Sequence, residues 1–245
     1  MVKCTSSTLN LEILLRSIAF SIAFYGWSLV ILTLSLPFLI ISRTITFECG
    51  RLWVRVTCWL LREICHIRHQ LVNRHYIPNR QVIFASKHQS AWETLTFLLA
   101  SAQPAFVLKR ELLWVPLFGW FMWGLRMIAI NRKAKRRSMQ QLLEQAEKRI
   151  RQGRSIVIFP EGTRMPVGQT GTYHNGISAL YQHLNVPIVP VALNSGRHWP
   201  KKGIFKYPGQ IIMEFLPPIQ PGLDKETLIA TLRQQIEDKS KRLLD

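Results

Sequence analysis

A histidine and a glutamate five residues apart form the first pair in the sequence that could do acid–base chemistry. His88 and Glu93 lie between an apolar run at 82–85, typical of a buried strand, and a run at 94–100, typical of a helix. Within one helix, side chains at this spacing point about 140° apart, so they can meet only if His88 lies in the turn before the helix. Glu93 could then bind one ring nitrogen and leave the other as a general base. The alternative is a histidine that only caps the helix or packs in the core.

Further polar residues follow the ends of other predicted strands. A buried run at 155–159 leads into a Pro-Glu-Gly-Thr-Arg turn, in which glycine permits close approach of a ligand and arginine offers a planar fork for phosphate. Because parallel strands end at one edge of a sheet, such residues could converge on one anion. The candidate binding residues are Lys109, Arg132, Glu161, Gly162, Thr163 and Arg164. The alternative for each is a solvated surface position, and the pattern of a nucleotide P-loop is absent from the sequence.

Strand-like and helix-like runs alternate through the second part of the chain. Strands are predicted at 82–85, 105–108, 127–130, 155–159, 188–193 and 210–215. The clearest helix is predicted at 138–152, with Ser138 and Gln141 as a capping box, and the last helix is predicted to begin at Asp224. This order indicates the α/β class, with a mainly parallel sheet flanked by helices.

The N-terminal part is expected to be a membrane anchor. Residues 17–42 carry no charge, which is longer than the roughly 20 residues that a spanning helix needs. Residues 45–67 alternate apolar side chains with arginines, as in a basic amphipathic helix at a headgroup surface. Either a span followed by an interfacial helix or a hairpin in one leaflet fits this pattern. We therefore expect an anchor at 1–72 and a catalytic domain at 73–245 on the cytoplasmic side.

An aromatic stretch at 114–124 has two possible roles. It contains three tryptophans and two phenylalanines, is interrupted by Pro116 and Gly119, and is too short to span a bilayer. It could pack as a core helix. It could instead contact lipid tails or line a groove for an acyl chain, since tryptophan suits the membrane interface.

Charge and composition restrict the class of partner. The 245 residues carry a formal net charge of +18, which implies anionic partners such as nucleic acid, anionic membrane lipids or phosphorylated substrates. A mean hydropathy of +0.08 favours the membrane surface, and no nucleic acid is expected. The four cysteines show no metal-binding spacing, and His66 and His69 have no carboxylate cluster beside them. Neither a metal nor an organic cofactor is predicted.

Four ordered motifs together resemble the glycerolipid acyltransferases, most closely the 1-acylglycerol-3-phosphate acyltransferase (lysophosphatidate acyltransferase, PlsC-like) group. They are His88-x4-Glu93, the segment ending in Arg132, Phe-Pro-Glu-Gly-Thr-Arg at 159–164, and Val-Pro-Ile-Val-Pro at 186–190. The resemblance covers roughly residues 81–218. Two departures are present. The first motif usually carries aspartate where this chain has Glu93, and a lysine often found after the third motif is replaced around 173–175.

The resemblance implies transfer of a fatty acyl group from an acyl-CoA or acyl carrier protein thioester to the 2-hydroxyl of lysophosphatidate, which gives phosphatidic acid. His88 matches the family's base and Glu93 its orienting carboxylate. Arg132, Glu161, Gly162 and Arg164 match positions linked to the glycerol phosphate, and 186–190 matches a motif linked to the acyl donor. Membrane localisation follows, with a bacterial inner membrane the expected setting.

Three alternatives stay open at this point. The acceptor could be another lyso-lipid, such as a lyso-ornithine lipid or a lysophospholipid. The chain could be a cationic membrane-binding protein without chemistry, although that would not explain the ordered motifs. Finally, Ser90 could be an acyl-enzyme nucleophile, but it lies only two residues from His88 and no separate base is evident.

Overall fold

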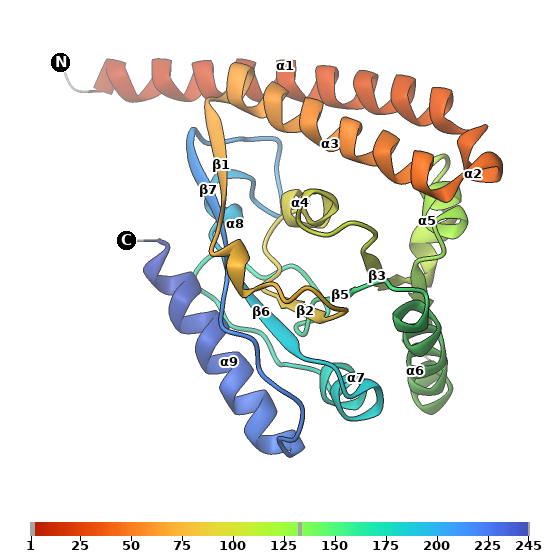
Figure 1. Ribbon diagram of the computed structural model, residues 1–245. Helices are drawn as coiled ribbons and strands as arrows, with labels where there is room; N and C mark the ends of the chain where they lie inside the picture. Colours follow the sequence, from red (N-terminus) through yellow and green to blue (C-terminus); the bar gives the residue numbers. More distant parts are fainter. Residues whose placement is uncertain (1–2, 132–133, 245) are drawn as a thin grey trace.

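A mixed, mostly parallel sheet forms the centre of the molecule (Figure 1). The computed structural model describes residues 3–131 and 134–244, and within them the sheet has seven strands in the order β1-β7-β6-β2-β5-β3-β4. The strands are β1 (Ile67–Val72), β2 (Ile83–Ser86), β3 (Ala105–Lys109), β4 (Ile128–Ile130), β5 (Ile156–Ile158), β6 (Ile188–Leu193) and β7 (Gly209–Phe215). All neighbouring strands are parallel except β6 and β7. The predicted α/β class is confirmed.

Helices cover both faces of this sheet. On one face lie α3 (Arg43–Cys65) and α4 (Trp92–Ala100), with α1 (Lys3–Ser35) outside α3. On the other lie α6 (Lys135–Arg151), α7 (Gly176–Leu184) and α9 (Lys225–Arg242). Alternate residues of β2 face the two layers, since Phe84 packs in the first core while Ile83 and Ala85 pack in the second. Burial on both faces explains why the strands appear as continuous apolar runs in the sequence.

The N-terminal helices form an antiparallel pair that lies along the α/β body. Trp27 Nε1 donates to the carbonyl of Trp53, and Trp53 Nε1 donates to Ser28 Oγ. Near the other end of α1, Ser17 Oγ accepts a hydrogen bond from the backbone of Lys206. Residues 10–35 are long and apolar enough to cross a membrane, but one face of α1 is packed against protein. The other face leaves large apolar side chains exposed.

Three short helices complete the described fold and connect the larger elements. They are α2 (Phe38–Ile41), α5 (Phe118–Gly124) and α8 (Ser195–His198), and two 3-10 turns occur at Arg74–Tyr76 and Arg110–Trp114. Helix α2 contacts α5, and the backbone of Gly124 lies so close to Leu39 that an added Cβ would be 2.8 Å from its Cδ2. The end of α5 is therefore held against the turn between α1 and α3.

Two local predictions differ from the structure. Residues 67–72 were expected to belong to the anchor, with no strand predicted, yet they form β1 and pair with β7. The capping box at Ser138 is wrong: α6 begins at Lys135, and the Ser138 hydroxyl donates instead to the carbonyl of Asn131. The predicted start of the last helix is confirmed, because the Asp224 side chain accepts from the Thr227 backbone, 2.9 Å away.

Candidate active site

The expected contact between His88 and Glu93 is present. His88 lies in the turn after β2, and Glu93 lies in the first turn of α4. His88 Nδ1 is 2.8 Å from Glu93 Oε1, so this nitrogen carries the proton when Glu93 is ionised. The second ring nitrogen, Nε2, is then the atom available to accept a proton. The ring of His88 stacks on Phe159 at a centroid distance of 4.0 Å, which restricts its rotation.

The Glu93 carboxylate is fully buried and receives donors on both oxygens. Its Oε1 accepts from the backbone N–H groups of Gln89 and Ser90, each at 2.7 Å. Its Oε2 accepts from the hydroxyl of Ser195, also at 2.7 Å. A buried charge needs such partners, so this carboxylate is held in one orientation. The role of Ser195 was missed, although it follows the end of a predicted strand that is parallel to β2.

The His88 ring opens on a cavity of about 800 Å³ that is mostly apolar. Its walls come from α4, α5, α6 and the strands β3 and β5, and include Leu98, Phe106, Met122 and Leu142. The proposed substrate-binding residues that line this cavity are Lys109, Gly162, Thr163 and Arg164, and Lys201 lines it as well. An apolar chamber with cations and a histidine at its wall is suited to a molecule with an acyl chain and an anionic group.

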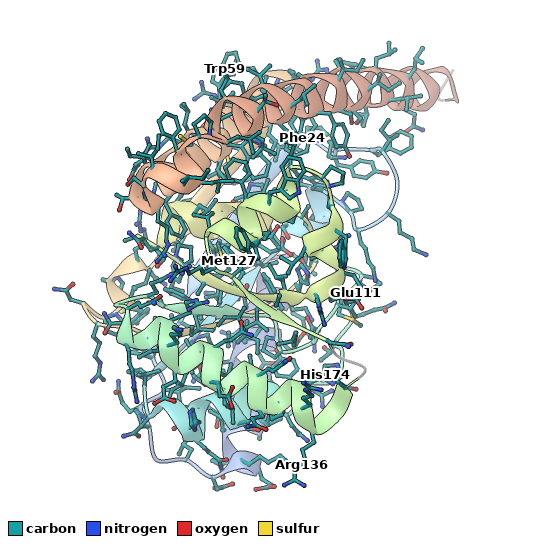
Figure 2. All side chains as sticks on the ribbon, turned by 90° about the vertical axis from the view of Figure 1, so that its right-hand side faces the viewer. Phe24, Trp59, Glu111, Met127, Arg136 and His174 are labelled. Atoms are coloured by element: carbon teal, nitrogen blue, oxygen red, sulfur yellow. The ribbon has the colours of Figure 1, made fainter. Side chains whose placement is uncertain are left out.

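The side chains of the aromatic stretch are divided between the core, the cavity and the outer surface. Phe118 and Met122 line the cavity, and Phe121 is buried. The side chains of Trp114, Trp120 and Trp123 are exposed to the outside. Figure 2 looks onto this side of the molecule, with Met127 below the paired N-terminal helices and His174 beside α6. The stretch therefore forms a wall between the cavity and the outer surface.

Glu161 does not line the cavity but is part of a buried ionic network. Its Oε1 is 2.7 Å from Lys87 Nζ and 2.9 Å from the backbone nitrogen of Gly171. Lys87, only 1 % exposed, also donates to both carboxylate oxygens of Glu237 on α9, each at 2.8 Å. Burial raises the pKa of the Tyr173 hydroxyl, and Glu237 raises it further, so Tyr173 stays a donor to Glu237. Sequence reasoning missed Lys87 and Glu237.

The remaining candidate residues are placed as follows. Gly162 has φ +65°, and its N–H donates to the Phe159 carbonyl, so this N–H closes the turn. Residues 188–190 begin β6, residues 186–187 directly precede it, and none of the five lines the cavity. Arg132 lies outside the described residues. Within the described part of the chain, no group of three or more His, Cys, Asp or Glu side chains is arranged to hold a metal.

Comparison with known proteins identifies the family. The acyltransferase family model matches residues 68–194. The chain is 41 % identical over 186 residues to the 1-acyl-sn-glycerol-3-phosphate acyltransferase of Pseudomonas aeruginosa, covering 76 % of this chain and 72 % of that protein. This chain belongs to the acyltransferase family. Membership favours an enzyme over the alternative of a membrane-binding protein without chemistry.

Other relatives of this acyltransferase support the same assignment. The 1-acyl-sn-glycerol-3-phosphate acyltransferase of Borreliella burgdorferi is 28 % identical over 202 residues, covering 80 % of this chain and 79 % of that one. The crystal structure of the LPA acyltransferase PlsC from Thermotoga maritima matches with a TM-score of 0.77 and 20 % identity. That match covers 94 % of this chain and 96 % of that one, and shows that the acyltransferase has the same fold.

Proposed function

We propose that this acyltransferase moves a fatty acyl group from an acyl-CoA or acyl carrier protein thioester to the 2-hydroxyl of 1-acylglycerol-3-phosphate, giving phosphatidic acid. The observation that carries the proposal is a histidine braced by a buried carboxylate at the wall of an apolar cavity that also bears cations. The names of the bacterial and mammalian relatives agree with this substrate.

The chemical step needs one base and no covalent enzyme intermediate. His88 Nε2 accepts the proton of the acceptor hydroxyl while the oxygen attacks the thioester carbonyl carbon. The carbon–sulfur bond then breaks, and the departing thiolate takes the proton from the imidazolium. Glu93 holds the ring in place and stabilises the imidazolium between these two transfers. Ser195 in turn holds Glu93, and so acts as a positioning residue.

The two ends of the acceptor suit different parts of the cavity. Arg164 and Lys109 line it near the turns that follow β5 and β3, where they would bind the phosphate, together with Arg132. Gly162 and Thr163, in the same turn as Arg164, also line the cavity and would contact the glycerol. Glu161 would act indirectly, by fixing this turn through its ion pair with Lys87. The apolar walls would hold an acyl chain. No cofactor takes part in this scheme.

We further propose that the helices of the expected anchor, which end at Cys65, attach the protein to one leaflet. Strand β1, at 67–72, then joins 73–245 in the catalytic domain on the cytoplasmic side. The support for a monotopic arrangement is that α1 lies along α3 and is tied to the body at Ser17 and at Trp27. A helix held this way presents one face to lipid. The arginines of α3 favour the cytoplasmic side.

The test of the chemistry is the variant His88→Ala, with His75→Ala on an exposed turn as the matched control. We expect His88→Ala to lower turnover about 10²–10⁴-fold, the usual contribution of a general base. Vesicle binding and thermal stability should stay at the level of the unsubstituted protein. Product mass from purified protein with lysophosphatidate and each thioester donor gives the readout. Retained turnover in His88→Ala would overturn the base assignment.

A second candidate acceptor, another lyso-lipid, is favoured by one observation. His174 and Asn175 line the cavity in the segment where the family often has a lysine. A panel of lysophosphatidate, lyso-ornithine lipid and lysophosphatidylethanolamine with one acyl donor separates the two candidates. We expect the highest kcat/KM with lysophosphatidate, and a preference for an acceptor without a phosphomonoester would replace the proposed substrate.

A further inference from the structure

Four arginines converge at the end of the sheet that is remote from His88. Arg154 lies two residues before β5, whose other end leads to the turn that carries Arg164. Arg149 lies in the last turn of α6, Arg126 precedes β4, and Arg43 is the first residue of α3. No ion pair involves any of the four within the described residues. We call these residues the arginine cluster.

Hydrogen bonds place the two inner guanidinium groups side by side. Arg149 Nε donates to the carbonyl of Arg126 at 2.6 Å, and Arg154 Nη1 lies 3.5 Å from the same oxygen. Arg154 is 2 % exposed and also donates to the carbonyls of Leu125 and Pro104. Its guanidinium carbon lies 5.4 Å from the ring centroid of Phe47, one turn after Arg43 on α3. The cluster is therefore a built feature of the fold.

The cluster has more positive charge and more donors than the protein itself satisfies. Arg149 is 7 % exposed, and its Nη1 atom has no hydrogen-bond partner among the described residues. Burial lowers the pKa of Arg154 and Arg149, and the neighbouring guanidinium groups lower each pKa further. The acidic residue nearest along α3, Glu48, is bound to Arg51 instead. Like charges and an unpaired buried donor both cost free energy, and one bound anion would relieve both.

The outer part of the cluster lies beside the surface that we assign to lipid. Arg43 and Arg126 are accessible, and Arg43 follows α2 by two residues while Arg126 follows α5 by two. Next to them, Ile40 is 92 % and Trp123 is 76 % exposed. Figure 1 shows α2 and α5 adjacent to the start of α3. In the proposed membrane placement, an anion at this place would be a lipid headgroup, because the exposed apolar side chains beside it would face the tails.

We propose that the arginine cluster binds the phosphate group of an anionic phospholipid. Arg43 and Arg126 make the first contact at the rim of the cluster. Arg149 Nη1 provides the inner donor. The site is separate from the acceptor site, because it lies at the amino ends of β3 and β5 and not at their carboxyl ends. The inference rests on the proposed membrane placement but not on the acyl-transfer chemistry.

The test uses the double variant Arg43→Gln/Arg126→Gln and the control Lys241→Gln/Arg242→Gln, which loses the same charge at the exposed end of α9 (Figure 1). Thermal unfolding is followed in neutral detergent at low salt. The additives are short-chain phosphatidylglycerol, phosphatidylcholine of the same chain length, and inorganic phosphate. Because no acyl donor is present, failure of the transferase proposal would not affect this result.

We expect phosphatidylglycerol to raise the Tm of the unsubstituted protein and of the control by about 2–4 °C over phosphatidylcholine. In Arg43→Gln/Arg126→Gln, this rise should fall to less than a third. Without lipid, the double variant should keep or raise its Tm, since two mutually repelling charges are gone. If it does not fold, the single variant Arg126→Gln at the exposed position is measured in the same way.

Three outcomes would overturn the proposal. An equal rise with inorganic phosphate alone would show that the cluster takes a free anion and not a lipid headgroup. An equal rise with phosphatidylglycerol in both double variants would show that the net charge of the protein, and not the cluster, attracts the lipid. A drop in Tm of Arg43→Gln/Arg126→Gln with an unchanged lipid effect would show that these arginines only brace the fold.

Discussion

At the scale of single residues, Glu93 connects the most parts of the candidate site. It binds the histidine, two backbone N–H groups of the turn after β2, and a hydroxyl from the segment after β6. The aspartate usual at this place in the family is one methylene shorter. In this chain the longer side chain meets donors at 2.7–2.8 Å, so the local geometry is adjusted to glutamate.

This fit predicts different effects for two substitutions of Glu93. We expect Glu93→Gln to lower kcat/KM about 10²–10³-fold, because an amide keeps the size but cannot stabilise the imidazolium. Glu93→Asp keeps the charge and withdraws it by about one carbon–carbon bond, so we expect a smaller loss of roughly tenfold. Steady-state kinetics, with thermal unfolding as the control, measures both. If kcat/KM were lower in Glu93→Asp than in Glu93→Gln, the length of the side chain would matter more than its charge, which would contradict this prediction.

Sequence reasoning could find His88 and Glu93 because they are five residues apart and their contact depends only on a strand, a turn and a helix. Ser195 is 102 residues from Glu93, and Lys87 is 150 residues from Glu237. Their contacts depend on the order of strands in the sheet and on where α9 packs. A single sequence does not contain that order in any local pattern, so these residues were missed.

At the scale of elements, α9 is tied to the active site through the buried network. Glu237 lies on α9, and Lys87 directly precedes His88 at the end of β2. Glu161 belongs to the turn after β5 that carries Arg164, and the backbone of Gln169 also accepts from Lys87. One cation therefore joins three chain segments beside His88. The carboxylates of Glu161 and Glu237 share this one cation, so removing Lys87 affects both of them, whereas removing one carboxylate leaves the other ion pair in place.

The network predicts an order of stability among substitutions. Lys87→Met leaves two buried carboxylates without their cation and should cost about 3–5 kcal/mol, enough to threaten folding. Glu237→Gln keeps the pair of Lys87 with Glu161 and retains an acceptor, so we expect a Tm loss of only a few degrees. Asp238→Asn, at the exposed neighbouring position, should have no effect. Thermal unfolding ranks the three, and equal stability of Lys87→Met and Glu237→Gln would contradict this account.

Element boundaries were predicted less well where the stop signal is unusual. Helix α3 ends at His66 in the left-handed conformation, φ +53°, where glycine is the usual signal, so the strand that follows was not recognised. Helix α6 begins at Lys135 without a side-chain cap, so the Ser138-Gln141 pattern indicated a start three residues too late. Where a standard cap exists, at Asp224, the boundary was predicted correctly.

At the scale of the whole molecule, apolar exposure is concentrated on the N-terminal helices and on α5. The large exposed apolar side chains of this surface include Ile22, Tyr25, Leu29, Leu34, Ile40, Ile41, Trp114, Trp120 and Trp123. Helices α2 and α5 touch, so the exposed side chains of these two helices are neighbours, and those of α1 and of the 3-10 turn at Arg110–Trp114 lie on the adjoining elements. We call these side chains together the apolar surface. An exposed region of this size is typical of a membrane contact.

The apolar surface predicts how the protein binds neutral membranes. We expect Ile40→Ser/Trp123→Ser to bind phosphatidylcholine vesicles about tenfold to a hundredfold more weakly, because each exposed side chain would lose at least about 1 kcal/mol of transfer free energy. Uncharged vesicles separate this contribution from that of the arginine cluster. Thermal stability in detergent should not fall, since neither side chain is buried in the protein. Unchanged vesicle binding by a folded double variant would mean that another surface meets the bilayer.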